Sequence, residues 1–318
     1  MNTEKRVLLG VDDSEFALQA VNTVGGLLKN SKDCGITLFY GAPDPKLPFL
    51  SKALGLGAEE IRHLEKVCSL EETNVLEQAK KALTDSGFDS HRIETICKAK
   101  CNDPADHMLK LAAKKGYETL ALGLRGSAQA ARKLMGSVAY KLVHLADDPT
   151  LWVIDPRISS RDVLVALVGA PISKRVVEHV VTYLSHLKDS RFTFFHVTPP
   201  LPPQYWDDAR ILDAKEHQER EKQIDQWMKG YAERVEAIAV EGKERLIQAG
   251  VPEKNVTVKI QPQDRGIARD ILEELESNNY GILVIGRKGS KEIDQFGLGS
   301  KAHKILHNGH ALAICVVN

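Results

Sequence analysis

One strand–loop–helix pattern occurs twice in the sequence. Both copies have the form G-x2-G-x9-G-S, preceded by an apolar run at 119–122 in the first and 282–285 in the second. The conserved letters of the pattern fall at Gly123, Gly126, Gly136 and Ser137, and again at Gly286, Gly289, Gly299 and Ser300. In both copies the apolar run is typical of a buried strand, and an apolar-periodic segment typical of a helix follows the serine. A duplication of this length predicts two copies of one domain.

The rest of the chain repeats in the same order. The apolar run 163–168 lies 156 positions beyond 7–12 (163 − 7), whereas Gly250 lies 163 positions beyond Gly87 (250 − 87). An insertion of seven residues (163 − 156) therefore falls in the second half, which contains a charged helical segment from about Asp207 to Ala249. The segment 155–161 resembles a linker. We expect domains at 1–156 and 157–318.

Strand-like and helix-like segments alternate in both halves. In the first half the expected strands are 6–11, 36–40, 93–96, 117–122 and 151–154, and the clearest helices are 70–83, 137–145 and those that begin after Ser14 and Asp103. Ser14 and Asp103 are of the residue types that cap helices, and Pro104 suits a first helical position. This alternation predicts an α/β fold with a parallel, doubly wound sheet in each half.

Composition excludes several classes of partner. Lys plus Arg and Asp plus Glu both number 43, so the formal net charge is zero and does not favour a polyanion such as nucleic acid. No apolar run has the length of a membrane span, and the N-terminus does not resemble a signal peptide. The five cysteines include no C-x2-C pair and are interpreted as reduced thiols rather than metal ligands. We expect a cytoplasmic protein.

The glycine loops have the chemistry of a phosphate site. Glycines allow backbone N–H groups to approach a phosphate closely, and a helix N-terminus at Gly136-Ser137 favours an anion. Arg125 in the first loop, and Arg287 with Lys288 in the second, would add charge-assisted contacts. One copy alone would fit ordinary loop glycines and a serine cap equally well, but the duplicated spacing makes chance improbable.

The two halves differ at the end of their first strand. Asp12 ends the first strand of the first half, where open α/β sheets place ligand-binding groups, and its carboxylate suits a ribose hydroxyl or an adenine amino group. A helix-capping or solvated aspartate is an equal alternative from local sequence, and neighbouring Asp13 could take the capping role instead. Val168 takes the place of Asp12 in the second half, so we expect that half to bind differently, more weakly or not at all.

Nearly the whole chain resembles the universal stress protein family in its tandem two-domain form. The resemblance rests on the first strand ending in Asp12, on Asn102-Asp103-Pro104-Ala105 and on both G-x2-G-x9-G-S loops. It implies two Rossmann-like domains of the adenine nucleotide alpha hydrolase type, each with a five-stranded parallel sheet flanked by helices. It also implies binding of ATP or a related adenine nucleotide, with or without Mg²⁺. The halves would form an intramolecular pseudo-dimer, and the last strand often makes a homodimer in the family.

The resemblance also implies a set of site residues. In the first half these are Asp12, the backbone of Gly41, Gly123, Arg125, Gly126, Gly136, Ser137 and Val138. In the second half they are Val197, Gly286, Arg287, Gly289, Gly299, Ser300 and Lys301. Each half departs from the family once: Val168 replaces the aspartate, and Tyr40-Gly41 replaces the His-Val pair that His196-Val197 retains.

These residues favour a stress-response protein that binds adenine nucleotide as a regulatory ligand, mainly in its first half. We find no nucleophile elbow, Walker lysine or catalytic triad, so efficient catalysis is not expected. One alternative is slow Mg-dependent ATP hydrolysis, with Asp12 or Asp13 holding the ion. Another is a module without nucleotide whose long charged helix in the second half binds a protein partner.

Overall fold

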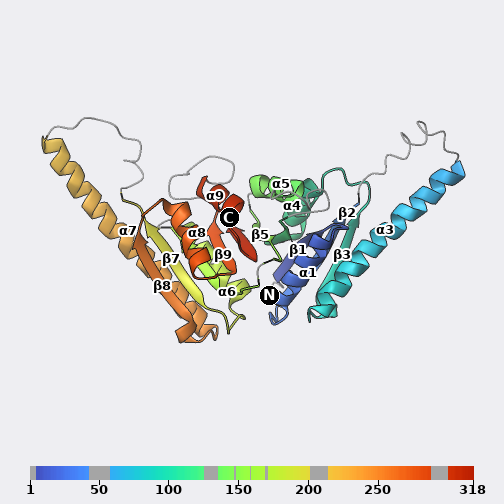
Figure 1. The fold of residues 1–318 in the computed structure, drawn as a ribbon, viewed down its shortest axis with the longest axis horizontal. Coiled ribbons are helices and arrows are strands. Elements are labelled where there is room, and N and C mark those ends of the chain that lie inside the picture. The colour runs from blue at the N-terminus through green and yellow to red at the C-terminus, as the bar shows by residue number, and fades with distance from the viewer. Residues whose placement is uncertain are drawn as a thin grey trace. The chain divides into compact units, whose positions relative to one another are not determined.

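The structure is a computed structural model that describes residues 5–42, 58–124, 135–146, 148–157, 159–168, 171–200, 214–287 and 300–318. The chain divides into two compact units, residues 1–157 and 158–318, which we call domain 1 and domain 2. Strands and helices alternate in both (Figure 1). The predicted α/β class is confirmed.

Domain 1 contains a sheet of five parallel strands. These are β1 (Lys5–Val11), β2 (Cys34–Gly41), β3 (Ile93–Lys98), β4 (Thr119–Gly123) and β5 (Thr150–Ile154). Its helices are α1 (Glu15–Leu28), α3 (Ala58–Asp85), α4 (Pro104–Lys115) and α5 (Ser137–Leu145), with a 3-10 turn at Ser90–Arg92. The strands pair in the order β3-β2-β1-β4-β5. The order reverses between β1 and β4, which is where open α/β sheets bind ligands.

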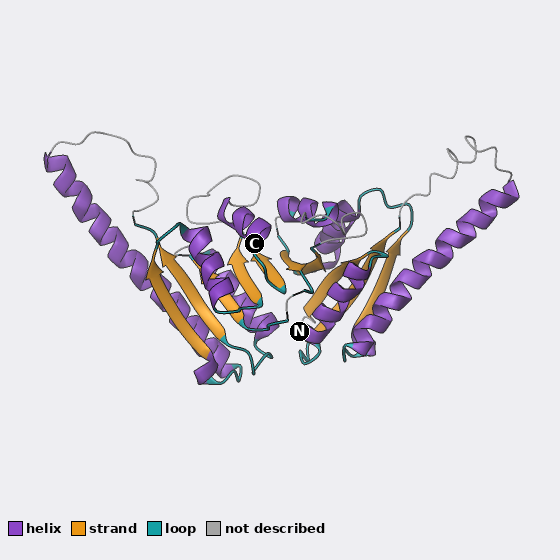
Figure 2. Ribbon diagram, viewed as in Figure 1, coloured by secondary structure: helices purple, strands orange, loops and turns teal. Residues whose placement is uncertain are grey.

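Helices cover both faces of this sheet (Figure 2). Helix α1 packs against α3, and α4 packs against α5. The crossovers from β1 to β3 run in one direction across the sheet, and those from β3 to β5 return in the other. Since such crossovers are right-handed, α1 and α3 lie on one face and α4 and α5 on the opposite face. The sheet is therefore doubly wound, as the sequence predicts.

Domain 2 repeats this arrangement. Its strands are β6 (Val163–Leu167), β7 (Phe192–Thr198), β8 (Val256–Pro262), β9 (Ile282–Gly286) and β10 (Ala313–Val317). Its helices are α6 (Ile172–Leu184), α7 (Ala214–Gln248), α8 (Ile267–Ser277) and α9 (Ser300–Asn308), with a 3-10 turn at Glu253–Asn255. The pairing order is β10-β9-β6-β7-β8, which is equivalent strand by strand to that of domain 1.

Fully buried strands form the core of each domain. Every residue of β5 and of β6 is buried, because helices cover the sheet on both faces. This is why these strands read as continuous apolar runs in the sequence rather than as alternating ones. The strands β3 and β8, at the ends of the pairing orders, are mostly exposed. The strands β3 and β8 are therefore the least buried of their domains, whereas β5, at the other end of the order in domain 1, is fully buried.

The predicted helix starts in domain 1 are confirmed. The Ser14 hydroxyl accepts a hydrogen bond from the N–H group of Ala17 at 3.1 Å and so caps α1. Asp103 caps α4 through the N–H group of Asp106 at 3.3 Å, and Pro104 is the first helical residue. Downstream of α3, Gly87 has φ +90°, a left-handed conformation that suits glycine after a helix.

The long helices α3 and α7 account for the insertion. The sequence pattern indicates a helix only from about Leu70, whereas α3 begins at Ala58. The predicted start of α7 near Asp207 lies outside the described residues. Helix α3 has 28 residues and α7 has 35, a difference (35 − 28) of seven, equal to the shift in the repeat spacing. Seven residues make about two helical turns, so the apolar face of the helix is preserved.

Candidate functional site

The structure places the ends of β1 and β4 side by side in domain 1. The two strands are paired, with Leu9 opposite Ala121. Asp12 follows the end of β1, and Gly123 ends β4. Because the strands are parallel, both residues lie at the same carboxyl edge of the sheet. The structure therefore brings together the two residues that the sequence assigns to opposite sides of one site.

The start of α5 is held at the same edge. The N–H group of Gly136 donates to the carbonyl oxygen of Leu124 at 2.8 Å, which joins the two ends of the glycine loop. The N–H group of Leu124 in turn donates to the carbonyl oxygen of Ile154 at the end of β5, at 2.7 Å. Arg125 and Gly126, also predicted at the site, lie outside the described residues. The loop therefore returns to β4 before the helix begins.

Helix α5 begins without a side-chain cap. Gly136 is its N-cap residue and makes no side-chain hydrogen bond to the first turn. Ser137 is exposed and Val138 is partly exposed, so the first turn of the helix faces outward. The first N–H groups of a helix have no partner within the helix and carry the positive end of its dipole. This helix start has the chemistry of an anion site.

Asp12 is fixed by the start of α1. Its carboxylate accepts hydrogen bonds from the N–H group of Ser14, at 3.0 Å, and from the Ser14 hydroxyl. Ser14, rather than Asp12, caps the helix. Asp12 is partly exposed and Asp13 is exposed. The carboxylate of Asp12 thus has a fixed position at the carboxyl edge, as a binding group requires.

Gly41 has a packing reason to be glycine. A Cβ atom at this position would lie 2.9 Å from Cys101 Sγ and 3.1 Å from Pro104 Cγ. The segment that follows β3 crosses the end of β2, where the N–H group of Cys101 donates to the carbonyl oxygen of Ala42 at 2.7 Å. The departure from the family's His-Val pair therefore makes room for this crossing segment.

The matching edge of domain 2 is closed by side chains. The Ser173 hydroxyl accepts from the N–H group of Val168 at 2.8 Å and also donates to the Val168 carbonyl oxygen. A Cβ atom on Gly286 would lie 2.7 Å from Ile172 Cγ1. The backbone of Val168 is therefore hydrogen-bonded within the domain, and α6 packs closely on the end of β9.

The other predicted residues of domain 2 lie in different environments. Arg287 is only 3% exposed, although the sequence suggests a cation in the loop, and its N–H group donates to the Val317 carbonyl oxygen at 2.7 Å. Val197 is buried beside His196, and Nδ1 of this histidine lies 2.8 Å from the Leu167 carbonyl oxygen. Burial lowers the pKa of His196, so its ring is neutral at pH 7. Gly289 and Gly299 lie outside the described residues.

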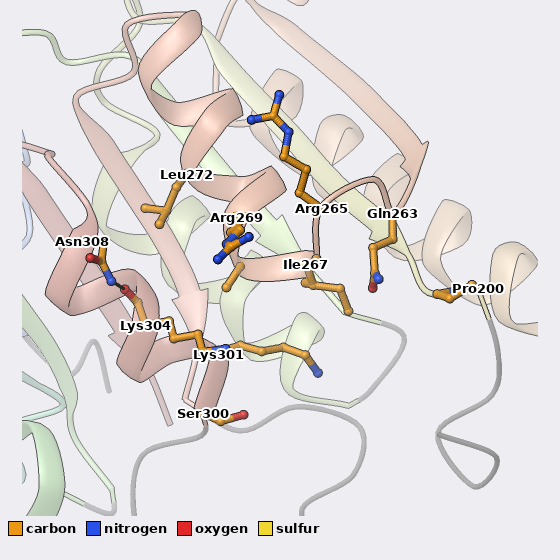
Figure 3. Close-up of a pocket in the computed structure, with 12 residues that line it drawn as sticks. Pro200, Gln263, Arg265, Ile267, Arg269, Leu272, Ser300, Lys301, Lys304 and Asn308 are labelled. Carbon is orange, nitrogen blue, oxygen red and sulfur yellow. Dashed lines mark hydrogen bonds between the residues drawn. The ribbon is translucent and has the colours of Figure 1, made fainter. Parts of the chain in front are cut away.

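Ser300 and Lys301 line a pocket that sequence reasoning does not predict. The pocket has a volume of about 910 Å³ and lies where α8, α9 and the segments after β7 and β8 meet (Figure 3). Its polar lining residues are Gln263, Arg265, Arg269, Ser300, Lys301, Lys304 and Asn308. This pocket could have been found by aligning the two halves at the 163-residue spacing. The residues that line it in domain 2 differ in charge from the residues at the equivalent positions of domain 1.

The equivalent place in domain 1 contains an ion pair. Lys141 Nζ on α5 lies 2.8 Å from Asp103 Oδ2 at the start of α4. The hydrogen bond from Lys141 is the main cause that lowers the pKa of Asp103. One carboxylate therefore caps α4 and joins it to α5.

Replacing Asp103 with alanine should reduce the free energy of unfolding by about 1 kcal/mol at pH 7, because the cap is lost. Lys141→Met should cost only about 0.5 kcal/mol, because the pair is solvent-exposed. Because the pKa of Asp103 is lower in the folded state, its ionised carboxylate stabilises the fold at pH values above the ordinary pKa of 3.8. This stabilisation disappears as the pH falls through the lowered pKa. Urea unfolding at pH 7 and at a strongly acidic pH below the lowered pKa should show a larger Asp103→Ala deficit at pH 7. A deficit of the same size at both pH values would contradict this assignment.

The described part of the chain lacks two other features that would suggest a function. Within the described residues, no group of three or more His, Cys, Asp or Glu side chains is arranged to hold a metal ion. None of the helices in the described part of the chain has the length and apolar character needed to cross a bilayer.

Comparison with known proteins identifies the family. The model of the universal stress protein family matches residues 4–153 and again residues 160–314. The fold is similar to a universal stress protein from Archaeoglobus fulgidus, with a TM-score of 0.61, 17% identity and 99% of each chain covered. It is also similar to a functionally unknown protein from Pseudomonas aeruginosa, with a TM-score of 0.59, 10% identity and coverage of 99% of this chain and 93% of that one.

A putative universal stress protein from Pseudomonas aeruginosa gives a TM-score of 0.57 at 12% identity, with 99% of this chain and 94% of that one covered. Comparison with curated proteins finds no match. At these identities the structural matches show the fold, and the double match of the family model shows the family. The chain belongs to the universal stress protein family and carries the family's domain twice.

Proposed function

We propose that domain 1 binds ATP or a related adenine nucleotide as a regulatory ligand in a cytoplasmic stress response. The uncapped start of α5, held by Gly136 at the carboxyl edge of the sheet, carries the proposal. Asp12 lies at the same edge, where the chain order of the sheet reverses. An anion site next to a fixed carboxylate suits a molecule with phosphates at one end and hydroxyl or amino donors at the other.

Each predicted residue has a role in this proposal. The N–H groups of Ser137 and Val138 would bind phosphate oxygens at the positive end of the helix dipole. Gly136 would contribute by having no side chain, since its own N–H group is donated to Leu124. Asp12 would accept a hydrogen bond from the ribose or the adenine amino group. The resemblance to the family adds Gly123, the backbone of Gly41, and Arg125 and Gly126 in the loop.

Domain 2 is the weaker nucleotide site in this proposal. Val168 has no carboxylate for the ribose or base, and its backbone is bonded to Ser173. Gly286, Arg287 and Val197 are occupied in packing, as described above. Ser300 and Lys301 remain accessible at the start of α9. Nucleotide should therefore occupy one site per chain before it occupies a second.

Equilibrium dialysis of the purified chain with ATP tests the proposal. We expect saturable binding of one equivalent, and at least about tenfold weaker binding by Asp12→Val, which copies domain 2. A hydrogen bond to a charged group is worth about 1.5–3 kcal/mol, or roughly 10- to 150-fold in affinity. Asp13→Val is the matched control, because Asp13 is adjacent and exposed, and its affinity should equal that of the wild type.

The same dialysis separates binding from hydrolysis. A regulatory ligand should be recovered as ATP, with or without Mg²⁺, whereas a slow hydrolase would release ADP or AMP in amounts that grow with time. Absence of saturable binding by the wild type would overturn the proposal, and equal loss in Asp12→Val and Asp13→Val would remove Asp12 from the site.

A further inference from the structure

The pocket between α8 and α9 is lined by cations from both helices. Figure 3 shows Arg269 projecting from α8 and Lys301 and Lys304 projecting from α9 toward the pocket. No carboxylate and no aromatic ring is present among the described residues that line it. A pocket with several cations and without aromatic rings among its described lining residues suits a highly charged ligand better than a nucleobase.

The internal repeat shows that this charge is specific to domain 2. At the 163-residue spacing, Asn102, Asp103, Asp106, Val138 and Lys141 of domain 1 correspond to Arg265, Gly266, Arg269, Lys301 and Lys304. The formal charge at these five positions is −1 in domain 1 (two acids, one base) and +4 in domain 2 (four bases, no acid). The same groove therefore changes sign between two copies of one fold.

Both domains have a lysine at one of these positions, Lys141 in domain 1 and Lys304 in domain 2, and in domain 1 it binds a carboxylate. Lys141 contacts the carboxylate of Asp103 at 2.8 Å, and the same carboxylate caps α4. In domain 2 the lysine is retained as Lys304, but the carboxylate is lost because Gly266 stands in its place. Gly266 makes no side-chain cap, and no heavy atom lies within 4 Å of the position that its Cβ would take. Among the described residues that line this pocket, domain 2 therefore has no carboxylate in the place of the one that binds Lys141 in domain 1.

The loop before α8 is held in place without using these cations. The carboxylate of Asp270, which is 3% exposed, accepts hydrogen bonds from the N–H groups of Asp264 and Arg265, both at 2.9 Å. The side chain of Arg265 pairs with Glu273 at 3.2 Å and points away from α9 (Figure 3). Among the described residues, neither Arg269 nor Lys304 has an ion pair. Their charges therefore remain for a ligand.

We propose that this pocket binds the diphosphate group of a small phosphorylated ligand. Arg269 and Lys304, together with the uncapped start of α8, balance more negative charge than one carboxylate carries, and Lys301 lines the same pocket. The site differs in residues and in ligand chemistry from the nucleotide site proposed for domain 1, since it has no group that selects adenine. The diphosphate could come from inorganic pyrophosphate or from a nucleotide.

Isothermal titration of the full-length protein with pyrophosphate, ATP and adenosine tests this proposal. We expect pyrophosphate to bind and adenosine not to bind through this pocket. Arg269→Asp, which restores the residue of domain 1, and Lys304→Gln should each weaken this binding at least about tenfold, as expected for loss of a charge-assisted contact. Lys141→Gln is the matched control: it alters the equivalent lysine of domain 1 and should leave pyrophosphate binding unchanged.

The variants also separate this proposal from the nucleotide site. Asp12→Val should weaken ATP binding in domain 1 and leave pyrophosphate binding unchanged, whereas Arg269→Asp should do the reverse. Circular dichroism and thermal unfolding confirm that each variant is folded. Pyrophosphate binding that Arg269→Asp and Lys304→Gln both leave unchanged in folded protein, or that Lys141→Gln weakens equally, would overturn the proposal even if ATP binds in domain 1.

Discussion

Trp152→Ala is expected to lower the free energy of unfolding of domain 1 by about 3–5 kcal/mol, the usual cost of emptying a large buried site. Trp152 is 0% exposed at the centre of β5. Its neighbour across the sheet is Ala121 on β4, so a large side chain lies next to a small one. Alanine at 152 would leave a void that these small neighbours do not fill.

The equivalent residue of domain 2 provides the control. Cys315 occupies the matching position of β10, is also 0% exposed, and lies opposite Val284. Cys315→Ala removes a single atom and should cost only about 1 kcal/mol. Hydrogen exchange measured by mass spectrometry resolves the two domains separately. Faster exchange in domain 1 for Trp152→Ala, with domain 2 unchanged, is the expected result, whereas equal effects of the two variants would show that Trp152 is not a main element of its core.

The fold could be predicted because it depends on local patterns and on a repeat. Continuous apolar runs such as those of β5 and β6 indicate strands that are covered on both faces, and the structure buries them fully. Capping residues such as Ser14 predict the first residue of a helix to within one position. The start of α3 was missed because Gly55 and Gly57, just before it in the sequence, argue against a continuous helix, and because its apolar pattern is weak: the mean hydropathy of this helix is negative. Elements with a clear apolar pattern and a recognisable cap can therefore be predicted from the sequence, and elements without them cannot.

The candidate site was only partly predictable, because packing between distant residues decides it. The sequence places Asp12 and Gly123 at the ends of two strands, and the two residues lie near each other because those strands, β1 and β4, are paired. It does not show that Gly41 accommodates Cys101, or that Ser173 bonds to the backbone of Val168. The basic pocket of domain 2 was missed for the same reason, since its cations come from two helices separated by a strand.

A carboxylate placed at the start of α5 is expected to abolish most nucleotide binding without weakening the helix. Gly136 has φ −61° and ψ 152°, a conformation open to any residue, and aspartate is a favoured N-cap residue. Gly136→Asp should therefore leave thermal stability equal or slightly higher. Two unit charges 4 Å apart near a protein surface repel by about 4 kcal/mol, which exceeds the roughly 2.7 kcal/mol of a 100-fold loss. We expect ATP affinity to fall at least about 100-fold in equilibrium dialysis.

Gly299→Asp separates the two copies of the motif. Gly299 has the same place in the second G-x2-G-x9-G-S motif, but the first strand of that half is followed by Val168, which takes the place of Asp12. If domain 1 is the nucleotide site, Gly299→Asp should change ATP affinity by less than about twofold, well below the loss from adding the same charge in domain 1. Gly136→Ala, which adds a methyl group without charge, separates steric from electrostatic loss. Equal losses of ATP affinity in Gly136→Asp and Gly299→Asp would mean that both loops bind nucleotide alike, and that the strand-end residues do not decide which loop is occupied.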